Sequence, residues 1–116
     1  MLVSGEYDWE LALSLHEEGN LSGARAAYER AANLGHAAAQ CNLGTLFDDE
    51  ITPPDPVAAV YWYEMAARAG EACAAWNLAV HYRKKNDREK ELEWLEVAAN
   101  MGDEDAQRDL GRTSHG

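Results

Sequence analysis

The chain is poor in the residue types that build β-sheets. Valine, isoleucine and threonine together supply only 9 of its 116 residues, whereas alanine alone supplies 21. Because β-branched residues favour strands and alanine is the best helix former, this composition predicts an all-α protein. A length of 116 residues suits one domain. The sequence therefore excludes a β-sandwich or a doubly wound α/β sheet, and it predicts a single helical domain over residues 1–116.

Positive charge is also scarce. Ten Lys and Arg residues stand against 21 Asp and Glu, which gives a net charge of −11 at pH 7. Such a negative field repels phosphate backbones, so we expect no nucleic-acid partner, and protein or peptide partners of basic character are favoured. No run of about 18 apolar residues is present, and residues 1–6 lack the basic and apolar regions of a signal peptide. We expect no membrane insertion.

Cysteines and catalytic motifs are few or missing. Cys41 and Cys73 are too few for a disulfide framework, which favours a reducing, cytoplasmic location. Whether these two cysteines pair is left open. The sequence has no paired-histidine zinc motif, phosphate-binding loop, Cys-x-x-Cys or nucleophile elbow. We therefore expect no catalytic residues, no enzymatic activity, no cofactor and no bound metal.

Internal repetition is what the sequence has in abundance. A glycine recurs at positions 35, 70 and 102, each time with alanines three and four residues earlier and a large side chain seven residues earlier. Apolar residues at these intervals lie on one face of a helix. Eleven residues before the glycine, Ala24 and Ala59 correspond to Glu91, so the apolar pattern breaks in the third repeat. A second apolar series follows each glycine, which makes every repeat a pair of helices.

The repeats predict the domain organisation. An amphipathic helix pair cannot bury its apolar face alone, so the pairs must stack into a solenoid with a cap at its end. The expected repeats cover residues 6–36, 37–71 and 72–103, followed by a capping helix at about 104–113. The expected helices cover residues 6–18, 21–34, 37–49, 56–69, 72–85, 88–101 and 104–113. Asn20, Asp55 and either Asn86 or Asp87 are the expected N-caps.

These residues resemble the Sel-one-like repeat family, a relative of the tetratricopeptide repeat. The second repeat carries the family pattern most fully, through Ala39, Leu43, Gly44, Phe47, Ala59, Trp62, Tyr63, Ala66, Ala67 and Gly70. The first repeat closes with the family's Gly35-His36 pair, for which we expect a structural role. The resemblance covers about residues 7–112 and implies a right-handed α/α superhelix. It further implies an adaptor or scaffolding module that binds other proteins.

A concave groove is the expected binding surface. In tetratricopeptide-like stacks the first helix of each pair lines this groove, and its exposed residues are out of phase with the buried ones. The expected partner-binding residues are Trp9, Leu13, Asn42, Thr45, Asp48, Trp76, Asn77, Val80 and Arg83. Glu10, His16, Cys41, Arg108 and Arg112 are expected to line the same surface.

Two kinds of side chain suggest how the groove binds. Asn42 and Asn77 share one register, seven residues after their glycines, and an amide can pair with the backbone of an extended peptide. The alternative is that both are solvated or cap a neighbouring helix. Trp76 is the expected apolar anchor, since Trp is enriched in binding hot spots. Trp9 either serves likewise or closes the N-terminal end of the stack.

The charge distribution leaves two functions open. Residues 48–50 are all acidic and residues 83–85 all basic, so a partner with a basic end would be oriented along the groove. We predict an interaction module that binds a partner segment there. The alternative is an acidic inhibitor or immunity protein that occludes a basic toxin or enzyme. The chain is also open to interpretation as a fragment of a longer repeat array.

Overall fold

The computed structural model describes residues 5–111, which form seven α-helices and one π-helical segment and contain no strand. The elements in chain order are α1 (Glu6–Glu17), α2 (Leu21–Asn33), α3 (Ala37–Thr45), η1 (Leu46–Glu50), α4 (Pro56–Arg68), α5 (Ala72–Lys84), α6 (Arg88–Asn100) and α7 (Glu104–Asp109). None of these helices is long and apolar enough to cross a membrane.

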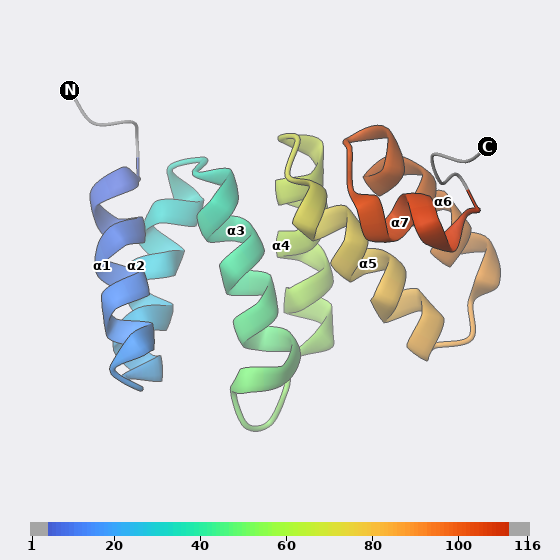
Figure 1. The fold of residues 1–116 in the computed structure, drawn as a ribbon. Coiled ribbons are helices and arrows are strands. Elements are labelled where there is room, and N and C mark those ends of the chain that lie inside the picture. Colours follow the sequence, from blue (N-terminus) through green and yellow to red (C-terminus); the bar gives the residue numbers. More distant parts are fainter. Residues whose placement is uncertain (1–4, 112–116) are drawn as a thin grey trace.

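The helices stack in pairs along one direction (Figure 1). The pair α1 and α2 stands at the N-terminal end, α3 and α4 follow, and α5 and α6 with the single α7 stand at the C-terminal end. The described part of the chain measures 43 × 36 × 22 Å along its principal axes. This arrangement confirms the predicted all-α solenoid.

Side-chain caps and left-handed glycines set the ends of the helices. Asn20, Asp55 and Asp87 each accept a hydrogen bond from the backbone N–H three residues ahead, at 3.0–3.2 Å. Each thereby satisfies a donor that the first helical turn leaves unpaired. At positions 35, 70 and 102 the φ angles are 88°, 96° and 96°, which a residue with a Cβ adopts only at a cost. The predicted repeat boundaries therefore coincide with real helix ends.

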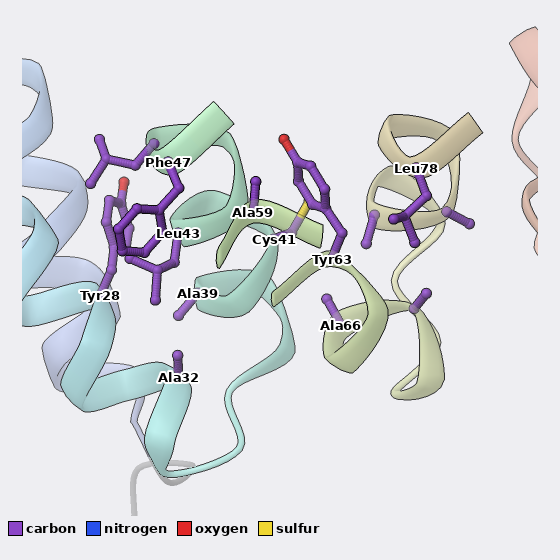
Figure 2. Close-up of a cluster of buried hydrophobic side chains, with 14 of the residues drawn as sticks. Tyr28, Ala32, Ala39, Cys41, Leu43, Phe47, Ala59, Tyr63, Ala66 and Leu78 are labelled. Carbon is purple, nitrogen blue, oxygen red and sulfur yellow. The ribbon is translucent and has the colours of Figure 1, made fainter. Parts of the chain in front are cut away.

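The core consists of alanines surrounding a few large side chains. The positions three, four and seven residues before each repeat glycine are all buried, as the periodicity predicts. Figure 2 shows Tyr28 between the first and second pairs and Tyr63 between the second and third. Gly44 lets α3 approach the ring of Tyr63 closely, since a Cβ at this position would lie 2.6 Å from the ring. Small residues thus permit the close helix packing on which the stack depends.

Two predicted helices differ in their last turns. The helix expected over residues 37–49 is α-helical only to Thr45 and continues as a π-helical turn, closed by a hydrogen bond from the N–H of Ile51 to the carbonyl of Leu46. This wider turn accompanies the burial of both Leu46 and Phe47. The helix expected over residues 104–113 ends at Asp109, because Gly111 turns the chain with a φ of 77°. Residues 112 and 113 lie outside the described part.

Candidate partner-binding groove

The predicted groove residues lie on α1, α3, η1 and α5, the first helices of the three pairs. Arg83 and Glu10 are exposed and Cys41 is buried. The other members with a described position on these elements are half-buried: Trp9, Leu13, His16, Asn42, Thr45, Asp48, Trp76, Asn77 and Val80. Half-buried side chains are held by their neighbours and still reach solvent. Arg108 on α7 is exposed, and Arg112 lies outside the described residues.

A polar network that the sequence analysis missed joins the first two repeats. The His16 ring lies between a hydroxyl and a carboxylate. Its Nδ1 is 2.9 Å from the Tyr28 hydroxyl, and its Nε2 is 2.6 Å from Glu50 Oε2. A neutral His16 therefore holds its proton on Nε2, donates it to Glu50 and accepts from Tyr28. Burial and the charge of Glu50 raise the pKa of Tyr28, whereas the Asn42 side chain lowers it. Asn42 therefore lies near the Tyr28 hydroxyl of α2.

A second network involves the acidic end of the groove. The Tyr63 hydroxyl lies 3.3 Å from Asp48 Oδ2 and 3.4 Å from Thr45 Oγ1. Burial raises the pKa of Tyr63 well above its ordinary range, so its hydroxyl stays protonated at physiological pH. It donates its hydrogen bond to one of these two oxygens. Asp48 and Glu50 therefore both have partners within the chain, while Asp49 between them is exposed.

The C-terminal part of the groove contains the two other residues singled out above. The Asn77 side-chain amide points to Cys41 Sγ at 3.9 Å, a weak contact because sulfur is a poor acceptor. The Arg83 guanidinium lies over the Trp76 ring, 5.8 Å from its centre, in cation–π geometry. Arg83 also donates to Glu91 and to Asp109, at 2.6 Å each, and these hydrogen bonds raise its pKa.

Trp9 on α1 packs against the turn that begins α3. Its ring stacks on that of His36 with centres 4.9 Å apart, and its indole N–H is buried with no hydrogen-bond partner among the described residues. His36 caps α3 by accepting from the N–H of Ala39, and its other nitrogen lies 2.8 Å from Glu6. The structural role predicted for His36 is confirmed.

A shallow hollow that the sequence analysis did not predict lies between α4 and the end of α5. It has a volume of about 260 Å³ and is lined by Pro56, Val57, Val60, His81 and Lys85. Burial lowers the pKa of His81, the cations Lys85 and Lys84 lower it further, and Asp48 opposes them. Val57 and Val60 lie three residues apart outside the repeat's buried register, which was the available sequence signal.

A comparison with known protein families divides the chain at nearly the same boundaries as the repeats. A Sel1 repeat model matches residues 9–36, 37–71 and 74–103. The chain belongs to the Sel1 repeat family. Sel1 repeats generally act as protein–protein interaction modules, which agrees with the predicted class of function.

Two solved structures share the Sel1 fold with this chain. One is a protective antigen of uropathogenic Escherichia coli strains with an SLR fold, at 26% identity and a TM-score of 0.80 over 92% of this chain and 25% of the antigen. The other is a Sel1 repeat protein from Oxalobacter formigenes, at 26% identity and a TM-score of 0.76 over 92% of this chain and 46% of that one. The chain thus spans under half the length of each. No curated protein matches it.

Proposed function

We propose that the chain is a non-catalytic interaction module that binds an extended segment of a partner protein along α1, α3 and α5. The observation that carries this proposal is the shared register of Asn42 and Asn77. They occupy equivalent, half-buried positions on α3 and α5. Amides repeated at the spacing of the stack can pair with successive parts of a peptide backbone, whatever its side chains.

The two amides differ in how easily they exchange partners. Asn77 faces a sulfur at 3.9 Å, so pairing with a peptide carbonyl or N–H replaces a weak contact by a stronger one. Asn42 lies near the Tyr28 hydroxyl, so pairing with a peptide competes with a polar neighbour that it already has. We therefore assign the larger share of binding to Asn77, with Asn42 as a second contact.

Trp76 supplies the apolar anchor in this mechanism. Its ring is half-buried and is held by Arg83, which two carboxylates fix in turn. A Trp held in place loses little conformational freedom when a partner side chain packs on it. Leu13, Thr45 and Val80 then provide the remaining contacts along the same helices.

Charge selects the partner. The net charge of −11, together with the exposed Glu10 and Asp49, favours a segment that carries Lys or Arg. Both cysteines are unpaired thiols, which supports a cytoplasmic location. His16 and Arg83 are both held by carboxylates of the chain, which supports a binding role and not a catalytic one.

A capture experiment followed by affinity measurement tests this function. The chain is used as bait in the lysate of its source organism, and a captured partner is divided into synthetic peptides whose dissociation constants are measured by calorimetry. We expect Trp76→Ala and Asn77→Ala each to raise the dissociation constant of the peptide tenfold or more, which corresponds to about 1.4 kcal/mol of binding free energy. Tyr61→Ala on α4, an exposed aromatic outside the groove, is the matched control and should leave the affinity unchanged.

Two outcomes contradict the groove mechanism. If both groove variants bind as tightly as the wild-type chain, the partner occupies another surface. If the partner is an intact basic protein, none of whose peptides binds, and moderate salt releases it, the inhibitor or immunity function is supported instead. Circular dichroism of every variant verifies that a loss of binding is not a loss of fold.

A further inference from the structure

The two cysteines of the chain come from different repeats and meet between α3 and α5. Cys41 is buried on α3, and Cys73 is exposed in the first turn of α5. Asn77, one turn after Cys73 on α5, donates to Cys41 Sγ at 3.9 Å, which places the two thiols near each other. Each thiol alters the pKa of the other. Cys73 Sγ also lies 3.6 Å from a Glu71 oxygen. The solenoid thus brings together two sulfurs that lie 32 positions apart in the sequence.

The two thiols differ in reactivity. Interaction with the Cys41 thiol lowers the pKa of Cys73, outweighing its partial burial and the charge of Glu71. The same interaction, together with burial, raises the pKa of Cys41. The thiolate is the reactive form of cysteine, so the exposed Cys73 is the site of first attack and Cys41 is shielded from external reagents. An exposed reactive thiol beside a second thiol is the arrangement of a redox-responsive pair.

We propose that Cys41 and Cys73 form a reversible disulfide that ties α3 to α5, with a low-molecular-weight disulfide such as oxidised glutathione as the oxidant. The Cys73 thiolate attacks one sulfur of the oxidant, releases one glutathione thiolate and leaves a mixed disulfide on Cys73. Cys41 then loses its proton to solvent and attacks Cys73 Sγ, which releases the second glutathione. Two protein thiols are oxidised, and one molecule of oxidant is reduced to two thiols.

Geometry favours the internal bond over competing products. Cys41 faces the side of α5 that carries Cys73 and Asn77, so the second step is intramolecular and outpaces the encounter with another molecule. The bond joins the second and third repeats, which otherwise depend on packing between neighbouring helices for their relative position. The bond also converts the Cys41 thiol that Asn77 contacts into a disulfide sulfur, so the surroundings of this amide differ between the reduced and oxidised chains.

Peptide mapping tests the pair directly. The reduced chain is equilibrated in buffers of increasing oxidised-to-reduced glutathione ratio, its remaining thiols are alkylated, and it is digested with trypsin without reduction. Cleavage after the arginines at 30, 68 and 83 places Cys41 in residues 31–68 and Cys73 in residues 69–83. We expect these two peptides to appear as one linked species that separates on reduction. The intact chain should lose two hydrogens in mass and remain monomeric on a non-reducing gel.

Two variants and a stability measurement sharpen the test. Cys73→Ser should give no glutathione adduct, because Cys41 is shielded, whereas Cys41→Ala should keep glutathione on Cys73, because nothing displaces it. The wild-type Tm should rise by roughly 10 °C on oxidation and return on reduction, since the bond closes a 32-residue segment. Dimers linked through Cys73, a lasting glutathione adduct on the wild-type chain, or no linked peptide under oxidising conditions would each overturn the proposal.

Discussion

The second and third repeats solve the same packing problem in opposite ways. Eleven residues before the repeat glycine, the second repeat has Ala59, which is 0% exposed, and the third has Glu91, which is 4% exposed. At Ala59 the contact is apolar. At Glu91 one carboxylate oxygen accepts from Arg83 at 2.6 Å and the other lies 3.1 Å from Arg88. One helix pair is therefore joined by small apolar residues and the other by a buried charge with two partners.

The residue that would pair with this buried position also differs between the two repeats. Arg83 lies thirteen residues after its repeat glycine, and the residue at this register in the second repeat is Asp48. A carboxylate at position 59 would therefore find an acid where Glu91 finds a base. Arg83 further reaches Asp109 on α7, so the same cation also holds the last helix of the stack. A buried charge is tolerated only where its partner is present, which is the lesson of this pair.

The largest expected effect comes from copying the buried acid into the second repeat. Ala59→Glu places a carboxylate without a cation in the core beside Asp48, and we expect a loss of roughly 3–5 kcal/mol in unfolding free energy. Urea denaturation followed by circular dichroism measures this loss. Tyr61→Glu, on the same helix but 55% exposed, is the control and should change stability little. Asp48→Arg should recover part of the loss, and a failure to recover any of it would contradict the pairing argument.

A smaller effect is expected where the two repeats differ in side-chain volume. The second repeat places Gly44 against Tyr63, whereas the equivalent residues of the third are Ala79 and Leu95. Gly44→Ala inserts a Cβ where the ring leaves no room, at a cost of roughly 1–3 kcal/mol. Tyr63→Leu should cost less in the Gly44→Ala background than in the wild-type chain, as a double-mutant cycle by thermal denaturation will show. Additive losses would mean that the contact is not tight.

Removing the acid from the third repeat should cost less than adding one to the second. Glu91→Ala leaves Arg83 and Arg88 without their shared carboxylate, but both arginines reach solvent and become hydrated. We expect a loss of about 1–2 kcal/mol, the size of a lost charge-assisted hydrogen bond. Chemical denaturation in low and high salt is the measurement. A loss as large as that of Ala59→Glu would show that the two joints are equally sensitive.

The smallest effect is the acid dependence of the same joint. The hydrogen bond from Arg83 holds the pKa of Glu91 below its ordinary value of 4.5, against the effect of burial. The unfolded chain then binds more protons than the folded chain below about pH 4.5, so the stability that Glu91 contributes is complete above this pH and declines as the pH falls through its lowered pKa. Glu91→Gln should show a correspondingly shallower decline. Parallel acid dependence in both chains would assign it to other carboxylates.

Periodicity predicted most of the fold because the buried face repeats at a fixed interval from each glycine. The ends of α2, α4 and α6 followed from the glycines and from N-caps such as Asn20 and Asp87. The π-helical turn at Leu46 was not predictable, because nothing in a local pattern distinguishes i→i+5 from i→i+4 hydrogen bonding. The extent of α7 was overestimated, because the turn at Gly111 competes with a weak helical signal.

The candidate site was predictable by register but not by contact. The predicted groove positions follow from their phase relative to the buried residues, so the half-buried positions of Asn42, Asn77 and Trp76 were predictable without the structure. Their neighbours lie 7–36 positions away in the sequence, such as Arg83 for Trp76 and Cys41 for Asn77, and the distant pairs depend on how the repeats stack. The sequence showed Glu91 as a break in a pattern, and only its distance to Arg83 shows why the break is tolerated.

The ionic joint also limits how this chain can be rearranged in evolution. Repeat proteins grow and shrink by duplication and recombination of whole units, which works when every unit presents the same faces. Here Glu91 of the third unit pairs with Arg83 on the first helix of the same unit, and Arg83 also pairs with Asp109 on α7. A crossover that joined α3 to α6 would set Asp48 against Glu91. Arg83, Glu91 and Asp109 lie one on each of α5, α6 and α7, so these three helices must be inherited together.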